Sequence, residues 1–413
     1  MVGRIRIRKQ SLWSIIILLS LCISCQKEKD FWGQLVENGS EDFKTYMSNP
    51  DSFELQILYT RLEKDSTGNW STTQKRFNID STKYFYPAST VKMPVAFLAL
   101  ERLKKLRDAG YDIDKETALR VFKSRYAQSP VNSDSTSQSG NASIGHYIYK
   151  LFAVSDNDAY NRLYEFLGRD YINQELRKKR IFSNSRIVTR VGVGGFDYDE
   201  NAYSNAIEFY TGDEVLYKKA AEQSTGNYFA ALNGEIKGKG YVKSGEDTPT
   251  MEPFDMSKKN FINLIDLQES LQRIIVPKLY AKEQQFDLSK EDYSFLKSAL
   301  SKLPSSYRYP NYDAKEYYDS YGKFFMYGDS KKPMPAHIKI YNKVGYAYGT
   351  LTDCAFIEDE KNDVRFFLSA TLLVNENGIF NDDTYEYDDG IAFLAELGRL
   401  IYGQEIRNEV DNE

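Results

Sequence analysis

The sequence predicts an α+β fold in which one antiparallel sheet, made from the two ends of the chain, is flanked by helices and carries an inserted all-helical lobe. Three observations predict this fold. Apolar and polar residues alternate near both ends, at 53–59 and at 338–344, as in half-buried strands. Helical spacing dominates the region between them, about 112–303. An amphipathic pattern at 390–402 predicts a closing helix.

The chain begins with a segment typical of an export signal. Basic residues crowd the first nine positions, and residues 11–24 are mostly apolar but too short to span a bilayer comfortably. The run ends in LCISC, with Cys25 last, and QKEKD follows at once. This arrangement resembles a bacterial lipoprotein cleavage site with Cys25 as the lipidated residue. Ordinary cleavage nearby and an uncleaved anchor are the alternatives. We therefore expect a protein of the cell envelope, on the periplasmic or another extracytoplasmic face, that contacts the membrane through a lipid anchor.

After this signal, residues 1–25, we expect a linker at 26–50, the folded domain at 51–405 and a polar tail at 406–413. The strand at 53–59 can pair with residues 74–79 across the turn-rich DSTGNW.

A helix is expected from Ser89 to about Arg107, where the sequence DAG ends it. Near the C-terminus, residues 352–357 and 364–374 are two further strands joined by the charged turn EDEKND. Such a two-lobed body offers a cleft at the seam between sheet and lobe, which is a common place for a small-molecule site.

Composition excludes several classes of function. The chain has 54 basic and 59 acidic residues, and loss of the basic leader makes it still more acidic, so nucleic acid is not an expected partner. With two histidines, His146 and His337, we expect no metal and no other cofactor. Neither histidine lies beside a nucleophile motif, so a hydrolase would need a different base. Beyond the signal Cys354 is the remaining thiol, which leaves no internal disulfide. We expect a monomer.

Tyrosine is abundant, with 32 residues, many of them in loops such as YRYPNYDAKEYYDSYG at 307–322. A carbohydrate site is one interpretation. Scattered surface packing is the interpretation that this distribution favours.

The stretch YPASTVKMPVAF, residues 86–97, combines a helix start with reactive groups. Ser89 and Lys92 are three residues apart and so share one face of a helix. The helix N-terminus favours an oxyanion on the acyl group that a serine carries, and a desolvated lysine can accept the serine's proton. The pair would supply nucleophile and base without histidine. The structural alternative is a common one, a serine cap followed by a solvated lysine.

A second motif, Ser155-Asp-Asn157, precedes a helix whose apolar positions face the core. Because serine, aspartate and asparagine are favoured capping residues, a simple helix cap is the alternative interpretation.

Together the two motifs resemble the penicillin-interacting serine hydrolases, and specifically the class A β-lactamases, which carry S-x-x-K, S-D-N and K-T/S-G. The likeness includes Pro87-Ala88 before the serine and extends loosely from residue 53 to residue 402. It implies a β-lactamase/transpeptidase-like fold. It also implies that Ser89 is acylated, Lys92 is its base, Ser155 relays a proton to the leaving nitrogen, and Asn157 binds the substrate amide.

Two segments compete for the third motif. Lys243-Ser-Gly has the hydroxyl residue that the family prefers but lies in a glycine-rich loop. Lys343-Val-Gly345 ends a strand-like run, and two strands and a terminal helix follow it, as the family requires. The resemblance therefore favours Lys343, which would attract a substrate carboxylate, with the backbone N–H groups of Tyr346 and Ser89 as an oxyanion hole.

The loop that frees the acyl-enzyme departs from the family pattern. Where class A β-lactamases have E-P-x-L-N, this chain has GVGGFDYDENAYSN, in which Glu200 and Asn205 have the wrong spacing and the proline is missing. Glu200 is the doubtful candidate for the deacylation base. The glycines of this loop lack a full phosphate-binding fingerprint, which favours a flexible turn.

Three functions follow from these residues. The first is an exported β-lactamase that hydrolyses the β-lactam amide. The second directs the same Ser-Lys machinery at D-Ala-D-Ala-like peptides or another amide or ester of the cell envelope. The third is a binding or sensing lipoprotein that keeps the fold without the chemistry.

Overall fold

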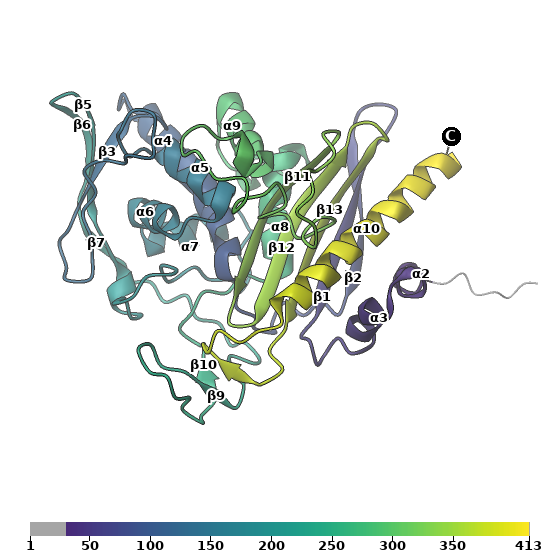
Figure 1. The fold of residues 1–413 in the computed structure, drawn as a ribbon. Helices are drawn as coiled ribbons and strands as arrows, with labels where there is room; N and C mark the ends of the chain where they lie inside the picture. The colour runs from purple at the N-terminus through teal and green to yellow at the C-terminus, as the bar shows by residue number, and fades with distance from the viewer. Residues whose placement is uncertain (1–29, 413) are drawn as a thin grey trace, which may run out of the picture.

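The computed structural model describes residues 30–412, so the expected export signal and Cys25 lie outside the described residues. At its centre is a five-stranded antiparallel sheet in the order β11-β12-β13-β1-β2 (Figure 1). Its strands are β1 (Gln56–Lys64), β2 (Trp70–Phe77), β11 (Ile338–Ala347), β12 (Thr350–Asp359) and β13 (Val364–Leu373). The predicted fold class is confirmed: the two ends of the chain meet where β1 pairs with β13.

Both faces of this sheet are buried, which explains the nearly continuous apolar run in β12. Ala355 and Ile357 face one hydrophobic core, and the alternate residues Cys354 and Phe356 face the other. Side chains alternate between the faces of a strand, so a strand covered on both sides is apolar over most of its length. The thiol of Cys354 is free and buried.

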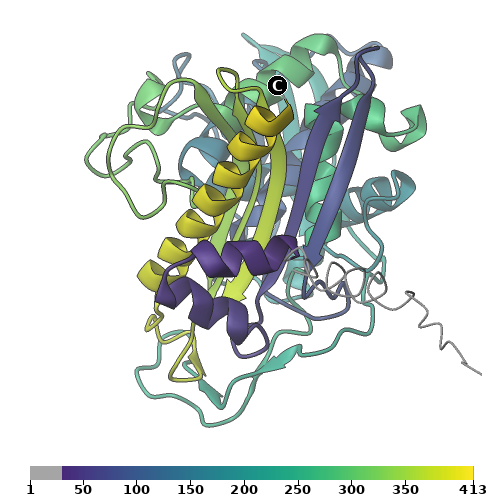
Figure 2. The same ribbon diagram turned by 90° about the vertical axis from the view of Figure 1, so that its right-hand side faces the viewer.

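Three helices cover the outer face of the sheet: α2 (Phe31–Asn38), α3 (Glu41–Ser48) and α10 (Tyr387–Asn412) (Figure 2). The linker expected at 26–50 is therefore wrong for most of its length. Asp30 and Ser40 cap the two short helices, and Ser40 also bonds Glu396 of α10 through its backbone N–H and its hydroxyl, each at 2.7 Å. The expected tail at 406–413 is likewise corrected, because α10 continues to Asn412.

The other face packs against α8 and the lobe (Figure 1). The helices on this side are α4 (Lys92–Asp108), α5 (Ile144–Val154), α6 (Asn157–Leu167), α7 (Arg169–Lys178), α8 (Leu264–Ile275) and α9 (Lys290–Ser301). Helix α4 is buried at nearly every position from Lys92 to Leu100, so it is the central helix of the molecule.

The lobe is not all-helical, which corrects the expectation for residues 112–303. It contains a three-stranded antiparallel sheet of β3 (Ala118–Phe122), β5 (Ala206–Thr211) and β6 (Glu214–Lys219). Strands β5 and β6 form a hairpin at whose turn Gly212 has φ of +55°, a conformation that glycine adopts without strain. Tertiary pairing with β3 completes this sheet, and helical spacing alone could not reveal it.

Short elements complete the chain. Pairs of two-residue strands are β4 (Tyr203–Ser204) with β7 (Glu222–Gln223), β8 (Ile236–Lys237) with β10 (Phe254–Asp255), and β9 (Gly240–Tyr241) with β14 (Ile379–Phe380). The 3₁₀ turns are η1 (Ala88–Val91), η2 (Glu200–Ala202), η3 (Pro277–Leu279), η4 (Lys282–Gln284) and η5 (Pro304–Ser306). Over residues 30–412 we find no helix with the length and apolar character needed to span a bilayer.

Candidate active site

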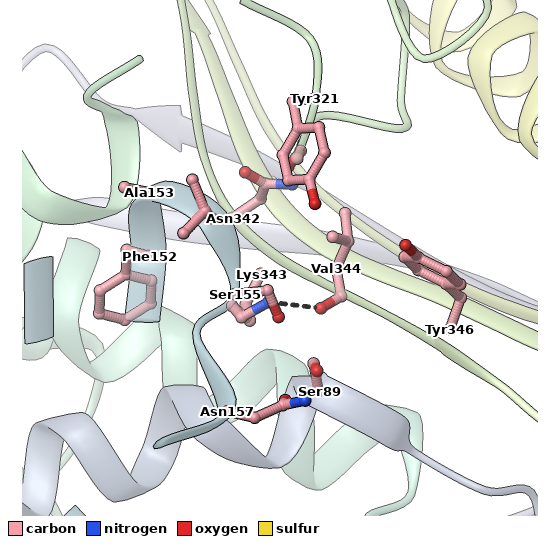
Figure 3. A pocket seen from close by; sticks show the side chains of 12 residues that line it. Ser89, Phe152, Ala153, Ser155, Asn157, Tyr321, Asn342, Lys343, Val344 and Tyr346 are labelled. Atoms are coloured by element: carbon pink, nitrogen blue, oxygen red, sulfur yellow. Dashed lines mark hydrogen bonds between the residues drawn. The ribbon is translucent and has the colours of Figure 1, made fainter. Parts of the chain in front are cut away.

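A cavity of about 310 Å³ lies where strand β11 meets the lobe. Figure 3 shows Ser155 and Lys343 side by side at its centre. It is lined by Ser89, Phe152, Ala153, Val154, Ser155, Asn157, Tyr321, Gly322, Asn342, Lys343, Val344 and Tyr346. The seam thus collects residues from η1, the α5–α6 junction, a tyrosine-rich loop and β11, which are far apart in the sequence.

Ser89 sits on a tight turn that leads into α4. The preceding Ala88 has φ of +45°, a left-handed conformation that costs a non-glycine residue roughly 1 to 2 kcal/mol. The turn is closed by Thr90, whose N–H and hydroxyl both bond the carbonyl of Pro87, at 3.0 and 2.7 Å. Its neighbours Ala88, Thr90 and Val91 are buried, whereas Ser89 is half-buried and lines the cavity.

Lys92 is fully buried beneath this turn. Its Nζ donates to the Ser155 carbonyl at 2.5 Å, to the Asn157 side-chain oxygen at 2.6 Å and to the Ser155 hydroxyl at 3.2 Å. All three acceptors are uncharged, so burial, and then the nearby Lys343, lowers the pKa of Lys92 well below 10.5. Among residues 30–412 no carboxylate forms an ion pair with this amine. Burial therefore destabilises the charged form of Lys92 relative to that of an exposed lysine, which makes the loss of a proton easier.

The second motif has two structural tasks. Asp156 caps α6 by accepting the N–H of Ala159 at 2.8 Å, as the capping interpretation predicts. Ser155 ends α5 in a left-handed conformation with φ of +58°, and this turn aims its hydroxyl into the cavity. The hydroxyl lies 3.2 Å from Lys92 Nζ and 2.9 Å from Lys343 Nζ. It can therefore pass a proton between these two amines or to a bound substrate.

The third motif is on the edge strand β11, where Lys343 is buried and donates to the Val344 carbonyl at 2.7 Å (Figure 3). The competing Lys243 is exposed and does not line this cavity. Gly345 allows the strand to touch the nucleophile turn, because a Cβ atom there would lie 2.6 Å from the Pro87 carbonyl and 2.8 Å from Ser89 N. The next residue, Tyr346, lines the cavity and is half exposed.

A buried network that the sequence did not reveal lies directly behind β11. Lys323 Nζ donates to the side-chain oxygen of Asn342 at 2.7 Å, and Asn342 donates to Asp353 at 2.8 Å. Burial lowers the pKa of Lys343 to about 7, and the positive Lys323 acts in the same direction while Asp353 opposes it. Burial also raises the pKa of the Asp353 carboxyl to about 6.

Residues 40–233, a little less than half of the chain, match a family model described as the Beta-lactamase enzyme family. This match supports the resemblance that the S-x-x-K and S-D-N motifs indicated. A variant of the last common ancestor of Gram-negative class A β-lactamases has a TM-score of 0.50 at 14% identity, covering 91% of this chain and 99% of the other. The β-lactamase of Desulfarculus baarsii gives a TM-score of 0.47 at 14% identity, covering 88% and 99%. No curated protein matches the chain in sequence. The TM-score of 0.50 over 91% of this chain shows that it shares the fold of that ancestral protein.

Glu200 is engaged away from the cavity. Arg125 binds the Glu200 carboxylate through two nitrogens, at 3.0 and 2.5 Å, and this hydrogen bonding lowers the pKa of Glu200. Glu200 does not line the cavity of Ser89, and that lining contains no carboxylate from the described part of the chain. The two histidines are also elsewhere: His146 faces a different cavity, and His337 is exposed before β11. The position of Glu200 therefore gives no support to its assignment as the deacylation base.

A glycine substitution tests the close contact between β11 and the nucleophile turn. Gly345→Ala must push the strand away from Ser89, so we expect acylation by benzylpenicillin to slow by about 10²-fold and stability to fall by roughly 1 to 3 kcal/mol. Mass spectrometry measures the first quantity and urea unfolding the second. Gly322→Ala is the matched control, because Gly322 lines the same cavity and a Cβ there meets nothing within 4 Å. Equal acylation rates for the two variants would contradict the contact.

Proposed function

We propose that this β-lactamase-family serine hydrolase is an exported, lipid-anchored enzyme of class A β-lactamase type that forms an acyl-enzyme at Ser89. The observation that carries the proposal is the buried amine of Lys92, held by uncharged acceptors next to a half-buried serine. The export signal and Cys25 are a sequence-based part of the proposal. A β-lactam, or a D-Ala-D-Ala-like peptide, is the substrate class that such a pair serves.

Acylation needs only residues of this chain. The Ser89 oxygen bonds the substrate carbonyl carbon, and neutral Lys92 takes the proton that this oxygen releases. The oxyanion is stabilised by the backbone N–H groups of Ser89 and Tyr346, and protonated Lys343 holds the substrate carboxylate. When the carbonyl–nitrogen bond breaks, the Ser155 hydroxyl gives its proton to the leaving nitrogen and recovers one from Lys92, 3.2 Å away. Asn157 is placed to bind the amide of the substrate.

Release of the acyl group lacks a dedicated base in this arrangement. Lys92 has no carboxylate partner among the residues described, and Glu200 is paired with Arg125. A water that attacks the ester therefore lacks the general-base assistance that typically speeds such steps by 10² to 10⁴-fold. We infer that the acyl-enzyme accumulates with ordinary β-lactams. This observation also favours the second function, in which the natural substrate is a peptide or another amide or ester of the envelope.

Labelling and turnover test the proposal together. Benzylpenicillin should add its mass stoichiometrically at Ser89, while a chromogenic cephalosporin is hydrolysed slowly. Ser89→Ala should not be labelled. Lys92→Arg should also not be labelled, because a guanidinium keeps its proton in this range. Lys290→Arg, an exposed lysine on α9, is the control and should behave as the parent.

Three other results would decide against parts of this proposal. Labelling of Lys92→Arg at near the parent rate would refute the assigned base. Rapid cephalosporin turnover without accumulation would refute slow release. Full function of Ser89→Ala in cells would show that acylation is not the purpose of the protein.

The pH dependence of acylation tests the role of Lys343. Its pKa of about 7 means that its positive charge, and its attraction for a substrate carboxylate, is present below pH 7 and is lost as the pH rises. The acylation rate with benzylpenicillin should therefore fall on the alkaline side of pH 7. The methyl ester of the same penicillin lacks the carboxylate, so its alkaline limb should be absent. Identical profiles for acid and ester, from stopped acylation reactions analysed by mass, would exclude this role.

A further inference from the structure

A second cavity, of about 620 Å³, lies along the same helix as the catalytic one. Its walls include His146 and Tyr149 of α5, Lys302 just after α9, and Tyr307 and Arg308 of the tyrosine-rich loop. None of the residues so far assigned to the chemistry contributes to it. It is the larger of the two cavities. It opens beside the tyrosine-rich loop, to which the acylation chemistry gives no role.

One stripe of α5 joins the two cavities. His146 and Tyr149 line the second cavity, and Phe152 and Ala153 line the catalytic one. Residues three and four apart lie on the same helix face, so these side chains form a single row. At a rise of about 1.5 Å per residue, the row from His146 to Ala153 spans roughly 10 Å. A ligand of that extra length could reach from one cavity to the other.

The tyrosine-rich loop follows the same direction. Ring contacts run in sequence from Tyr149 to Tyr307 with centroids 5.5 Å apart, and from Tyr307 to Tyr312 at 6.0 Å. They continue from Tyr312 to Tyr317 at 5.3 Å and from Tyr317 to Tyr321 at 4.9 Å, where the series enters the catalytic cavity. Aromatic rings packed edge to face hold each other in place. The loop is therefore an ordered aromatic wall between the two cavities.

The second cavity ends in positive charge without a protein counter-ion. The side chains of Lys302 and Arg308 form no ion pair or hydrogen bond within residues 30–412. Lys302 lies instead over the rings of Tyr307 and Tyr149, at 4.2 and 5.5 Å. The one carboxylate of the lining, Glu116, is 3.9 Å from Lys115.

Tyr307 contributes its ring, not its hydroxyl, to the cavity wall. Tyr307 is 4% exposed, and its hydroxyl oxygen is covered by the protein. The positive groups of the lining are therefore Lys302 and Arg308, and a pair of cations suits a carboxylate.

We propose that this cavity is a distal subsite that binds a carboxylate at the far end of an elongated acyl donor. The reacting carbonyl lies at Ser89, the middle of the donor follows the row of α5 and the aromatic wall, and the terminal carboxylate meets Lys302 and Arg308. The inference rests on the proposed acylation at Ser89 and extends it to the substrate class, an amide or ester whose acyl side is long and acidic.

Two matched penicillins test the subsite. Both carry a straight acyl side chain long enough to extend roughly 10 Å beyond the catalytic cavity, one ending in a carboxylate and the other in a carboxamide. The second-order rate of labelling at Ser89 should be about tenfold higher for the carboxylate, and the Lys302→Met/Arg308→Met double variant should remove this preference without changing the carboxamide rate. Lys331→Met is the control, because Lys331 lies over the Tyr318 ring at 5.1 Å outside the cavity.

The outcomes separate the subsite from the acylation chemistry. If both penicillins label Ser89 equally fast in the parent protein, the subsite is refuted and the proposed function stands. The same holds if the double variant keeps the preference. If neither penicillin labels Ser89, the proposed function fails. Calorimetric titration of Ser89→Ala still decides the subsite in that case, since it needs no acylation: tighter binding of the carboxylate, by about tenfold, supports the subsite and equal affinities refute it.

Discussion

The site depends on one constraint, the burial of a lysine amine without a counter-ion. Lys92 lies in the first turn of the central helix and is enclosed by the α5–α6 junction and by β11. A charged ammonium in that place would lose its hydration and, besides dipoles, gain only the weaker attraction of Asp156, with Lys343 adding a larger repulsion. In the proposed mechanism, the fold thereby obtains a base from a residue that is normally protonated. The proposed acyl-transfer chemistry then needs neither of the two histidines, which both lie elsewhere.

Two strained backbone positions also help to fix the geometry of the site. Ala88 and Ser155 both adopt left-handed backbone conformations, one beside the nucleophile and one beside the relay hydroxyl. Such conformations cost free energy and persist where surrounding structure enforces them. Here the enforcement comes from the contact of Gly345 with the nucleophile turn and from the amine of Lys92, which bonds the Ser155 carbonyl. Strand, turn and junction therefore fix each other's positions, and the network of Lys323, Asn342 and Asp353 supports the strand from behind.

Local sequence patterns predicted much of this arrangement. The three-residue spacing of Ser89 and Lys92, the alternation in β11 and the elements after Lys343 are all properties of short segments, and the sheet followed from them. The hairpin of β5 and β6 also left a local signal, an alternating run around Thr211-Gly212, which the dominant helical spacing of the lobe obscured. The helices at 31–48 were missed because short helices depend on docking, in this case on α10. The Lys323 network and the cavity along α5 join segments distant in sequence, so no local pattern could reveal them.

The most direct test of this account is the ionisation of Lys92 itself. Lysines labelled with ¹³C at the carbon next to the amine report their protonation by nuclear magnetic resonance, and Lys92→Arg identifies the signal to follow. The account predicts that this signal titrates well below the ordinary pKa of 10.5. A Lys92 signal that titrates near 10.5 in the folded protein would contradict it.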